Sequence, residues 1–230
     1  MIFITGDTHR MLDVKKLDTE NFPEQNMLSR RDVLIIAGDF GGVWTGSQKD
    51  DRVLDFHEEK NYTTLFVGGN HENYAALYSY PVEMWMGGKV HRVRDHVLHL
   101  MNGQIFEIEG KSFFVMGGAT SVDKMLREPY VTWWPQEEPS AAEFDEALKN
   151  LARVDFKVDY IITHTCPEMV RKGMFVTYEG FIDYESGVEK FLDKIILKAE
   201  YTKWFAGHIH IDREFDKYKM RILYNSVIKL

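Results

Sequence analysis

The chain has 230 residues and a formal net charge of −8 at pH 7, which suits one large domain or one domain with an insertion. Hydrophobic residues make up 44% of it and charged residues 28%, so a disordered chain is excluded. A single cysteine excludes an internal disulfide and a cysteine-rich zinc module. The acidic balance makes binding of long nucleic acid an unfavoured function, because that function needs a basic face.

The first residues, 1–5, lack the basic and long apolar regions of a signal peptide. No apolar run reaches the roughly 18–20 residues that a membrane helix needs. We therefore expect a cytoplasmic protein with no membrane partner.

Several short apolar runs end in a small residue, usually glycine, followed by a polar side chain that can bind a metal. The runs are 2–5, 33–37, 65–67, 160–163 and 204–206, and they lead into Asp7 and His9, Asp39, Asn70 and His71, His164, and His208 and His210. Continuous apolar runs of this length are typical of strands buried on both faces. In open α/β sheets, ligands bind at the carboxyl edge of the strands. One such strand end is explained by a turn alone, but the repeated pattern predicts a shared binding edge.

Between these runs, local patterns predict helices and a hairpin. The stretches 140–143 and 186–189, each Ser-x-x-Glu, are typical of capping boxes that open helices. Residues 50–60 predict a surface helix, and 213–228 predict a hairpin that turns near Asp216.

The domain organisation follows from where the strand ends fall. We expect one domain over 1–230, with substrate-site insertions at 73–112 and 119–158, because neither stretch carries a strand end with a metal-binding side chain. The sequence leaves the oligomeric state open.

The candidate residues share one chemistry. Carboxylate, amide and imidazole groups without thiolate suit Zn, Mn, Fe or Ni. The candidates are Asp7, His9, Asp39, Asn70, His71, His164, His208 and His210. They are too many for one tetrahedral ion and suit two divalent ions that share a bridging carboxylate. Two such ions, roughly 3.5–4 Å apart, can clamp a phosphoryl group and generate hydroxide at neutral pH.

The order of the motifs is specific. Asp-x-His comes first, Gly-Asp second, Gly-Asn-His-Glu third, a lone strand-end His fourth and Gly-His-x-His last. In this order the chain resembles the calcineurin-like metallophosphoesterase superfamily, in particular small phosphoesterases of bacteria and phages. The resemblance implies an α/β fold, a four-layer α/β/β/α sandwich of two mixed sheets.

The resemblance also implies roles for the site residues. One ion is bound by Asp7, His9 and His210, the other by Asn70, His164 and His208, and Asp39 bridges them. A hydroxide between the ions attacks phosphorus. Mn is the favoured metal for both ions. His71 contacts the phosphate and helps to protonate the leaving oxygen, while Glu72 orients His71.

The second motif departs from many relatives. After Asp39 it continues Phe-Gly-Gly, without the second Asp and without the phosphate-binding Arg of Ser/Thr phosphatases. We therefore expect a small, nucleotide-like phosphodiester as substrate. The alternatives are a phosphomonoesterase or protein phosphatase, a nuclease, and a non-catalytic metal-binding scaffold.

The stretch 117–139 resembles a signature of a bacterial and phage subgroup. Arg127 is our hypothesis for the missing phosphate-binding Arg and so for a catalytic residue; the alternative is a solvated turn. Trp133 and Trp134 either stack a nucleobase or pack onto the sheet, with packing favoured.

Four further residues outside these motifs need an interpretation. His91, Asp95 and His99 are interpreted as part of a partly solvated strand rather than a third metal site. Cys166 is interpreted as a small packed residue, because the sequence offers it no free general base.

Overall fold

The computed structural model describes residues 1–175 and 184–230, and their strands form two sheets. The first sheet has the order β13-β1-β2-β3-β6-β5-β4 and the second has the order β11-β12-β10-β9-β8-β7. The strands are β1 (Ile2–Thr5), β2 (Val33–Ile36), β3 (Thr63–Phe66), β4 (Val82–Trp85), β5 (Gly88–Arg94), β6 (Val97–Leu100), β7 (Ile105–Ile108), β8 (Lys111–Met116), β9 (Tyr160–Thr163), β10 (Lys203–Ala206), β11 (Arg213–Phe215), β12 (Met220–Ile222) and β13 (Val227–Lys229).

Both sheets are mixed. In the first, β1, β2, β3 and β6 run parallel, while β13, β5 and β4 are antiparallel to their neighbours. In the second, β8, β9, β10 and β12 run parallel, and the edge strands β7 and β11 are antiparallel. The parallel centre of each sheet carries the predicted apolar runs, so their carboxyl ends meet at one edge.

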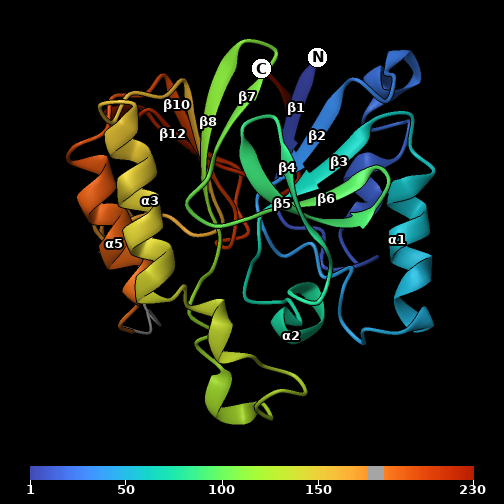
Figure 1. Ribbon diagram of the computed structural model, residues 1–230, viewed down its shortest axis with the longest axis horizontal. Coiled ribbons are helices and arrows are strands. Elements are labelled where there is room, and N and C mark those ends of the chain that lie inside the picture. The colour runs from blue at the N-terminus through green and yellow to red at the C-terminus, as the bar shows by residue number, and fades with distance from the viewer. Residues whose placement is uncertain (176–183) are drawn as a thin grey trace.

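Helices cover the outer faces of the two sheets (Figure 1). The α-helices are α1 (Asp51–Glu58), α2 (Tyr74–Leu77), α3 (Ala141–Arg153), α4 (Glu168–Phe175) and α5 (Gly187–Ile196). The inner faces pack on each other through residues such as Ile35 and Ile162. The outer face of the second sheet packs on α3 and α5 through Leu151 and Leu192, and that of the first packs on α1 through Leu54. The predicted four-layer arrangement is confirmed.

The two predicted capping boxes differ. At α3, Ser140 and Glu143 make both reciprocal hydrogen bonds. At α5, Ser186 accepts from the Glu189 N–H, but the Glu189 carboxylate accepts from Arg171 Nε at 2.6 Å instead of returning to Ser186. The predicted return bond from the Glu189 carboxylate to Ser186 is therefore wrong, because a buried guanidinium is the stronger donor.

The predicted hairpin is confirmed only in part. β11 and β12 pair antiparallel around a turn at Asp216–Tyr218, but β13 leaves the hairpin and pairs with β1 in the other sheet. β13 therefore ties the end of the described chain to its first strand.

The two stretches expected as insertions contribute to the layers. Residues 73–112 supply α2 and the strands β4, β5 and β6 of the first sheet, in which β6 pairs with β3. They also supply β7 of the second sheet. Residues 119–158 supply α3, and before it a segment with two short 3₁₀ helices, Lys124–Leu126 and Pro135–Glu137, that projects from the body of the molecule (Figure 1). In the described part of the chain, every helix is too short or too polar to cross a membrane.

Candidate metal centre

The predicted ligands follow strands β1, β2, β3, β9 and β10, and their side chains meet at one edge of the two sheets. Several of them occupy left-handed backbone conformations, with φ of 43° at His9, 46° at Asp39, 65° at His208 and 54° at His210. Such conformations cost roughly 1–3 kcal/mol each and are retained at functional sites. The strand ends are therefore bent sharply to aim side chains at a common point.

Two glycines allow the ligands to approach so closely. A Cβ at Gly38 would lie 2.0 Å from His164 Nδ1, and a Cβ at Gly207 would lie 2.2 Å from Asp7 Oδ1. Neither contact is possible, so any side chain there would push a ligand away. The glycine that follows the apolar run is thus required by the site as well as by the turn.

The first ligand group consists of Asp7, His9, Asp39 and His210, whose ligand atoms lie within 4.8 Å of one another. His9 Nε2 is 3.1 Å from Asp39 Oδ2, and His210 Nε2 is 3.1 Å from Asp7 Oδ2. Two further residues support this group. Asp13 accepts from His9 Nδ1 at 2.7 Å, and also accepts from the hydroxyl of Tyr224, whose ring stacks on His210. This leaves His9 Nε2 free to bind a metal.

The second ligand group consists of Asp39, His164 and His208. His164 Nε2 lies 3.3 Å from Asp39 Oδ1 and 3.1 Å from Asn70 Oδ1, so the Asn70 amide joins this group. His164 Nδ1 donates to the Ala37 carbonyl at 3.0 Å, which directs Nε2 toward the shared carboxylate. The structure therefore brings together all seven residues predicted as metal ligands.

The charges of the two groups suit cations. Burial alone would raise the pKa of Asp39, but the nearby His164 and His9 rings hold it well below its usual range. Burial alone would lower the pKa values of His9 and His164, but Asp39 and Asp7 raise both to about 9. Two imidazoles thus carry protons at the positions where divalent ions would place positive charge. Oxygen and nitrogen donors in two groups that share Asp39 fit a pair of divalent ions.

His71 lies beside the ligand groups rather than within them. The backbone N–H of His71 donates to Asp39 Oδ1 at 2.8 Å, and the ring of His71 packs edge-on against His9. Burial, with Arg127 and the neighbouring imidazoles, lowers the pKa of His71 despite the attraction of Asp39. These contacts favour the uncharged form of the His71 imidazole at the rim of the centre.

Glu72 does not reach His71 in the described hydrogen bonds, which corrects the expectation that its carboxylate orients that ring. Its fully buried carboxylate instead accepts from the Gly41 N–H at 3.0 Å. Burial raises the pKa of Glu72 to about 8. Glu72 therefore secures the loop after β2, while the ring of His71 lies beside His9 at the centre.

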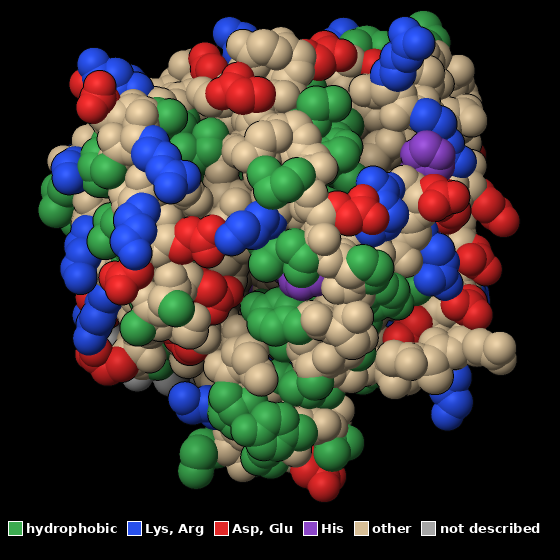
Figure 2. All heavy atoms as spheres, in the orientation of Figure 1, with side chains coloured by type: hydrophobic (Ala, Val, Ile, Leu, Met, Phe, Trp, Pro, Cys, Tyr) green, Lys and Arg blue, Asp and Glu red, His purple; other side chains and the backbone are tan. Residues whose placement is uncertain are grey.

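Arg127 comes from the projecting segment to the rim of the centre. Its Nη2 lies 3.4 Å from His71 Nε2, and its Nε forms an ion pair with Asp123 at 2.9 Å. Only 16% of its side chain is exposed, so it is not a solvated turn residue. Met125 and Leu126 beside it are exposed, and hydrophobic side chains gather over this segment (Figure 2).

The remaining expectations concern packing. Trp134 is buried against Trp44, as packing predicts, and Cys166 is buried with its pKa raised by that burial. The expectation of a partly solvated strand is confirmed at Arg92 and Arg94 of β5, which are half-buried, but not at the two histidines. The rings of His91 on β5 and His99 on β6 are both buried, and their Nδ1 atoms are 2.9 Å apart.

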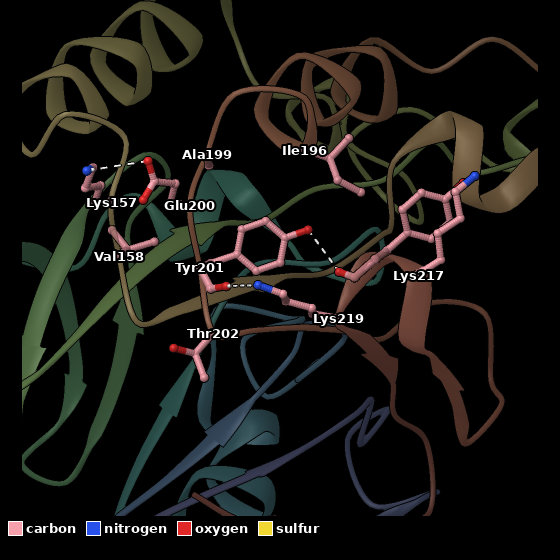
Figure 3. A pocket seen from close by; sticks show the side chains of 10 residues that line it. Lys157, Val158, Ile196, Ala199, Glu200, Tyr201, Thr202, Lys217 and Lys219 are labelled. Carbon is pink, nitrogen blue, oxygen red and sulfur yellow. Dashed lines mark hydrogen bonds and ion pairs between the residues drawn. The ribbon is translucent and has the colours of Figure 1, made fainter.

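A separate cavity of about 530 Å³ opens at the amino ends of β9, β10 and β12 (Figure 3). Lys157, Lys217 and Lys219 line it, and Lys157 faces Glu200 at 3.5 Å. This is the edge of the second sheet opposite to the ligand groups. Ligand-bearing residues and this cavity are thus segregated to the two ends of the same strands.

The comparison with protein families agrees with this geometry. The family model described as "Calcineurin-like phosphoesterase" matches residues 1–212. Similar solved structures include the phosphopantetheinyl hydrolase PptH from Mycobacterium tuberculosis, with a TM-score of 0.43 and 15% identity over 97% of this chain and 87% of that one. They also include the protein of unknown function AQ665 from Aquifex aeolicus, with a TM-score of 0.37 and 15% identity over 98% and 89% of the two chains. The comparison with curated proteins found no match.

Proposed function

The chain belongs to the calcineurin-like phosphoesterases, and from that premise we propose that it hydrolyses small, nucleotide-like phosphodiesters, using two divalent ions. The observation that carries this proposal is the Asp39 carboxylate, which lies between two ligand groups and also accepts from the His71 N–H. A single carboxylate with one oxygen toward each group suits two bound metal ions better than one.

The ligands divide between the two ions. Asp7, His9 and His210 would hold one ion, and Asn70, His164 and His208 the other, with Asp39 between them. When bound, the ions supply a hydroxide nucleophile at neutral pH and neutralise charge on the phosphoryl group. Mn is our favoured metal over Fe, Zn and Ni, because carboxylate and amide oxygens accompany the imidazoles.

His71 and Arg127 would act on the phosphate from the rim. The pKa of His71 is lowered mainly by burial, and a bound phosphate anion would raise it again by favouring the charged ring. His71 could then donate a proton to the leaving oxygen. Arg127 Nη2, 3.4 Å from His71 Nε2, would donate to a phosphate oxygen in the same space.

The preference for a small diester rests on what the second motif lacks and on net charge. Residues 40–42 follow Asp39 without the second Asp and the Arg of protein phosphatases. A net charge of −8 disfavours long nucleic acid. We place the reaction in the cytoplasm, where the buried, free thiol of Cys166 stays reduced.

The experiment compares hydrolysis of bis-p-nitrophenyl phosphate and p-nitrophenyl phosphate by the Mn²⁺-loaded protein. We expect the diester to be preferred. His71→Ala should lower kcat by about 100-fold or more, the size of a general-acid effect, with both ions retained. Turnover of neither ester by protein that holds two ions would favour the scaffold alternative, and preference for the monoester would contradict the diester assignment.

Arg127→Ala tests the phosphate contact. Removing a charged hydrogen bond should raise KM by about 10-fold or more, and Arg127→Lys should restore only part of the loss, because Lys lacks the fork geometry. Lys124→Ala is the matched control, since Lys124 is exposed in the same segment. A rise in KM of less than about twofold for Arg127→Ala would remove Arg127 from the site.

A further inference from the structure

The side-chain amide of Asn70 is held by a buried chain of hydrogen bonds that leads away from the ligand groups. Asn70 Nδ2 donates to Ser121 Oγ at 3.2 Å, and Ser121 Oγ donates to Glu137 Oε2 at 2.6 Å. The Ser121 N–H also donates to Glu137 Oε1 at 2.8 Å. Asn70, Ser121 and Glu137 are 6%, 2% and 1% exposed, so water does not compete for these bonds.

These hydrogen bonds can run in only one direction from donor to acceptor. A carboxylate accepts hydrogen bonds and donates none, so Glu137 forces the Ser121 hydroxyl to donate toward it. The lone pairs of that hydroxyl then face Asn70 and require a donor, which is the NH₂ end of the amide. The carbonyl end, Oδ1, is thereby turned toward His164. The opposite orientation would present an NH₂ group to the ligand position and leave two acceptors facing each other.

The Ser121 and Glu137 members of these hydrogen bonds come from the two ends of the 117–139 stretch, which we name the 117–139 clasp. The Ala119 N–H donates to the Glu137 carbonyl at 3.1 Å, which closes the clasp. The Gly118 N–H donates to the Gly68 carbonyl at 2.8 Å, two residues before Asn70. The clasp is thus attached to the end of β3 at the point where the ligand leaves the strand.

The neighbouring carboxylate has a different task. Glu138 accepts from Ser186 Oγ and from the Val188 N–H, each at 3.0 Å, and from Thr120 Oγ1. It ties the clasp to the start of α5 and does not contact Asn70 in the described hydrogen bonds. Two adjacent glutamates of one motif therefore separate anchoring of the segment from orientation of the amide.

We propose that Ser121 and Glu137 are positioning residues for the ion of the second ligand group, because they hold Asn70 with its carbonyl oxygen toward that ion. This rests on the proposed function only in requiring that the ion binds, and not in requiring turnover. Partners of metal ligands typically change metal affinity by about 10–100-fold when they are removed. The projecting segment that carries Arg127 is, on this view, also the support of a metal ligand.

The test uses Glu137→Gln and Ser121→Ala, with Glu138→Gln as matched control. Gln keeps the shape of Glu137 but can donate as well as accept, so residue 137 no longer fixes the direction of the hydrogen bonds from Asn70 through Ser121. We expect Mn²⁺ titration by calorimetry to show one of two ions bound about 10–100-fold more weakly in both variants, with the other unchanged. Glu138→Gln should leave both affinities within about threefold of the parent.

A second readout needs neither metal nor turnover. The Asn70 side-chain NH₂ pair should give a distinct, slowly exchanging signal in the NMR spectrum of the metal-free protein, and Glu137→Gln and Ser121→Ala should shift it while Glu138→Gln does not. Equal loss of both ions in all three variants, or unchanged affinity in Ser121→Ala with folding intact, would overturn the proposal. If the parent binds two ions but hydrolyses no ester, the proposed function fails while the positioning role is still measured.

Discussion

The two ligand groups of the centre use the same chemistry but are held in different ways. In the first, the side chain of His210 is 47% exposed and rests on the ring of Tyr224, near the surface. In the second, the side chain of His164 is fully buried and donates to the Ala37 carbonyl. His210 is thus supported by a contact near the surface, and His164 by a buried carbonyl. Equivalent ligands can therefore differ in what their loss does to the fold.

Asp39 belongs to both groups, so replacing it should have the largest effect. Asp39→Asn removes the charge that stabilises two ions and the two protonated imidazoles of the metal-free state. We expect binding of both ions to weaken by more than about 100-fold and diester turnover to be lost. Metal content after dialysis measures this. Retention of one ion at parental affinity would show that Asp39 is not shared.

Paired alanine variants of His164 and His210 test the contrast itself. His164→Ala opens a buried cavity and removes one of the two imidazoles paired with Asp39, so it should lower the free energy of unfolding by about 2 kcal/mol or more. For a chain of this size that is about 4–8 °C in Tm. His210→Ala, at an exposed position, should weaken metal binding with a Tm change below about 2 °C. Equal Tm losses measured by calorimetry in chelator would contradict the contrast.

The pH dependence of the metal-free protein tests the same imidazoles without a substitution. The pKa of His164 is about 9 in the folded protein against about 6.5 when unfolded. A raised folded pKa adds stability that is fully present below pH 6.5 and lost as the pH rises through 9. His208, with its pKa lowered to about 3 by burial and by His164, stays neutral in this window.

In chelator, the Tm should therefore fall by several degrees between pH 6.5 and 9. This corresponds to a loss of free energy of unfolding on the order of 1–3 kcal/mol. With saturating Mn²⁺ the trend should reverse below pH 9, because protons on His9 and His164 compete with the ions. A flat profile in chelator would mean that these imidazoles carry no extra proton in the folded state.

The sequence alone predicted the class of fold and the residues that gather at one edge of the sheets. Apolar runs long enough to be buried on both faces predict parallel strands, and the polar residue after each run is carried to the common edge. Asp7, Asp39 and His164 are such strand-end residues, and the structure places them together. The Ser140 helix start was equally local, because a capping box involves only four consecutive residues.

Contacts between distant segments were decided only by the tertiary structure. The direction of the Glu72 carboxylate, the burial of His91 and His99, and the bond from Asn70 to Ser121 across 51 residues depend on which surfaces the folded layers bring together. Residue type and periodicity state that a side chain is polar or apolar, but not which partner satisfies it. A buried polar group must find its partner wherever packing places one, and that partner is set by the fold as a whole.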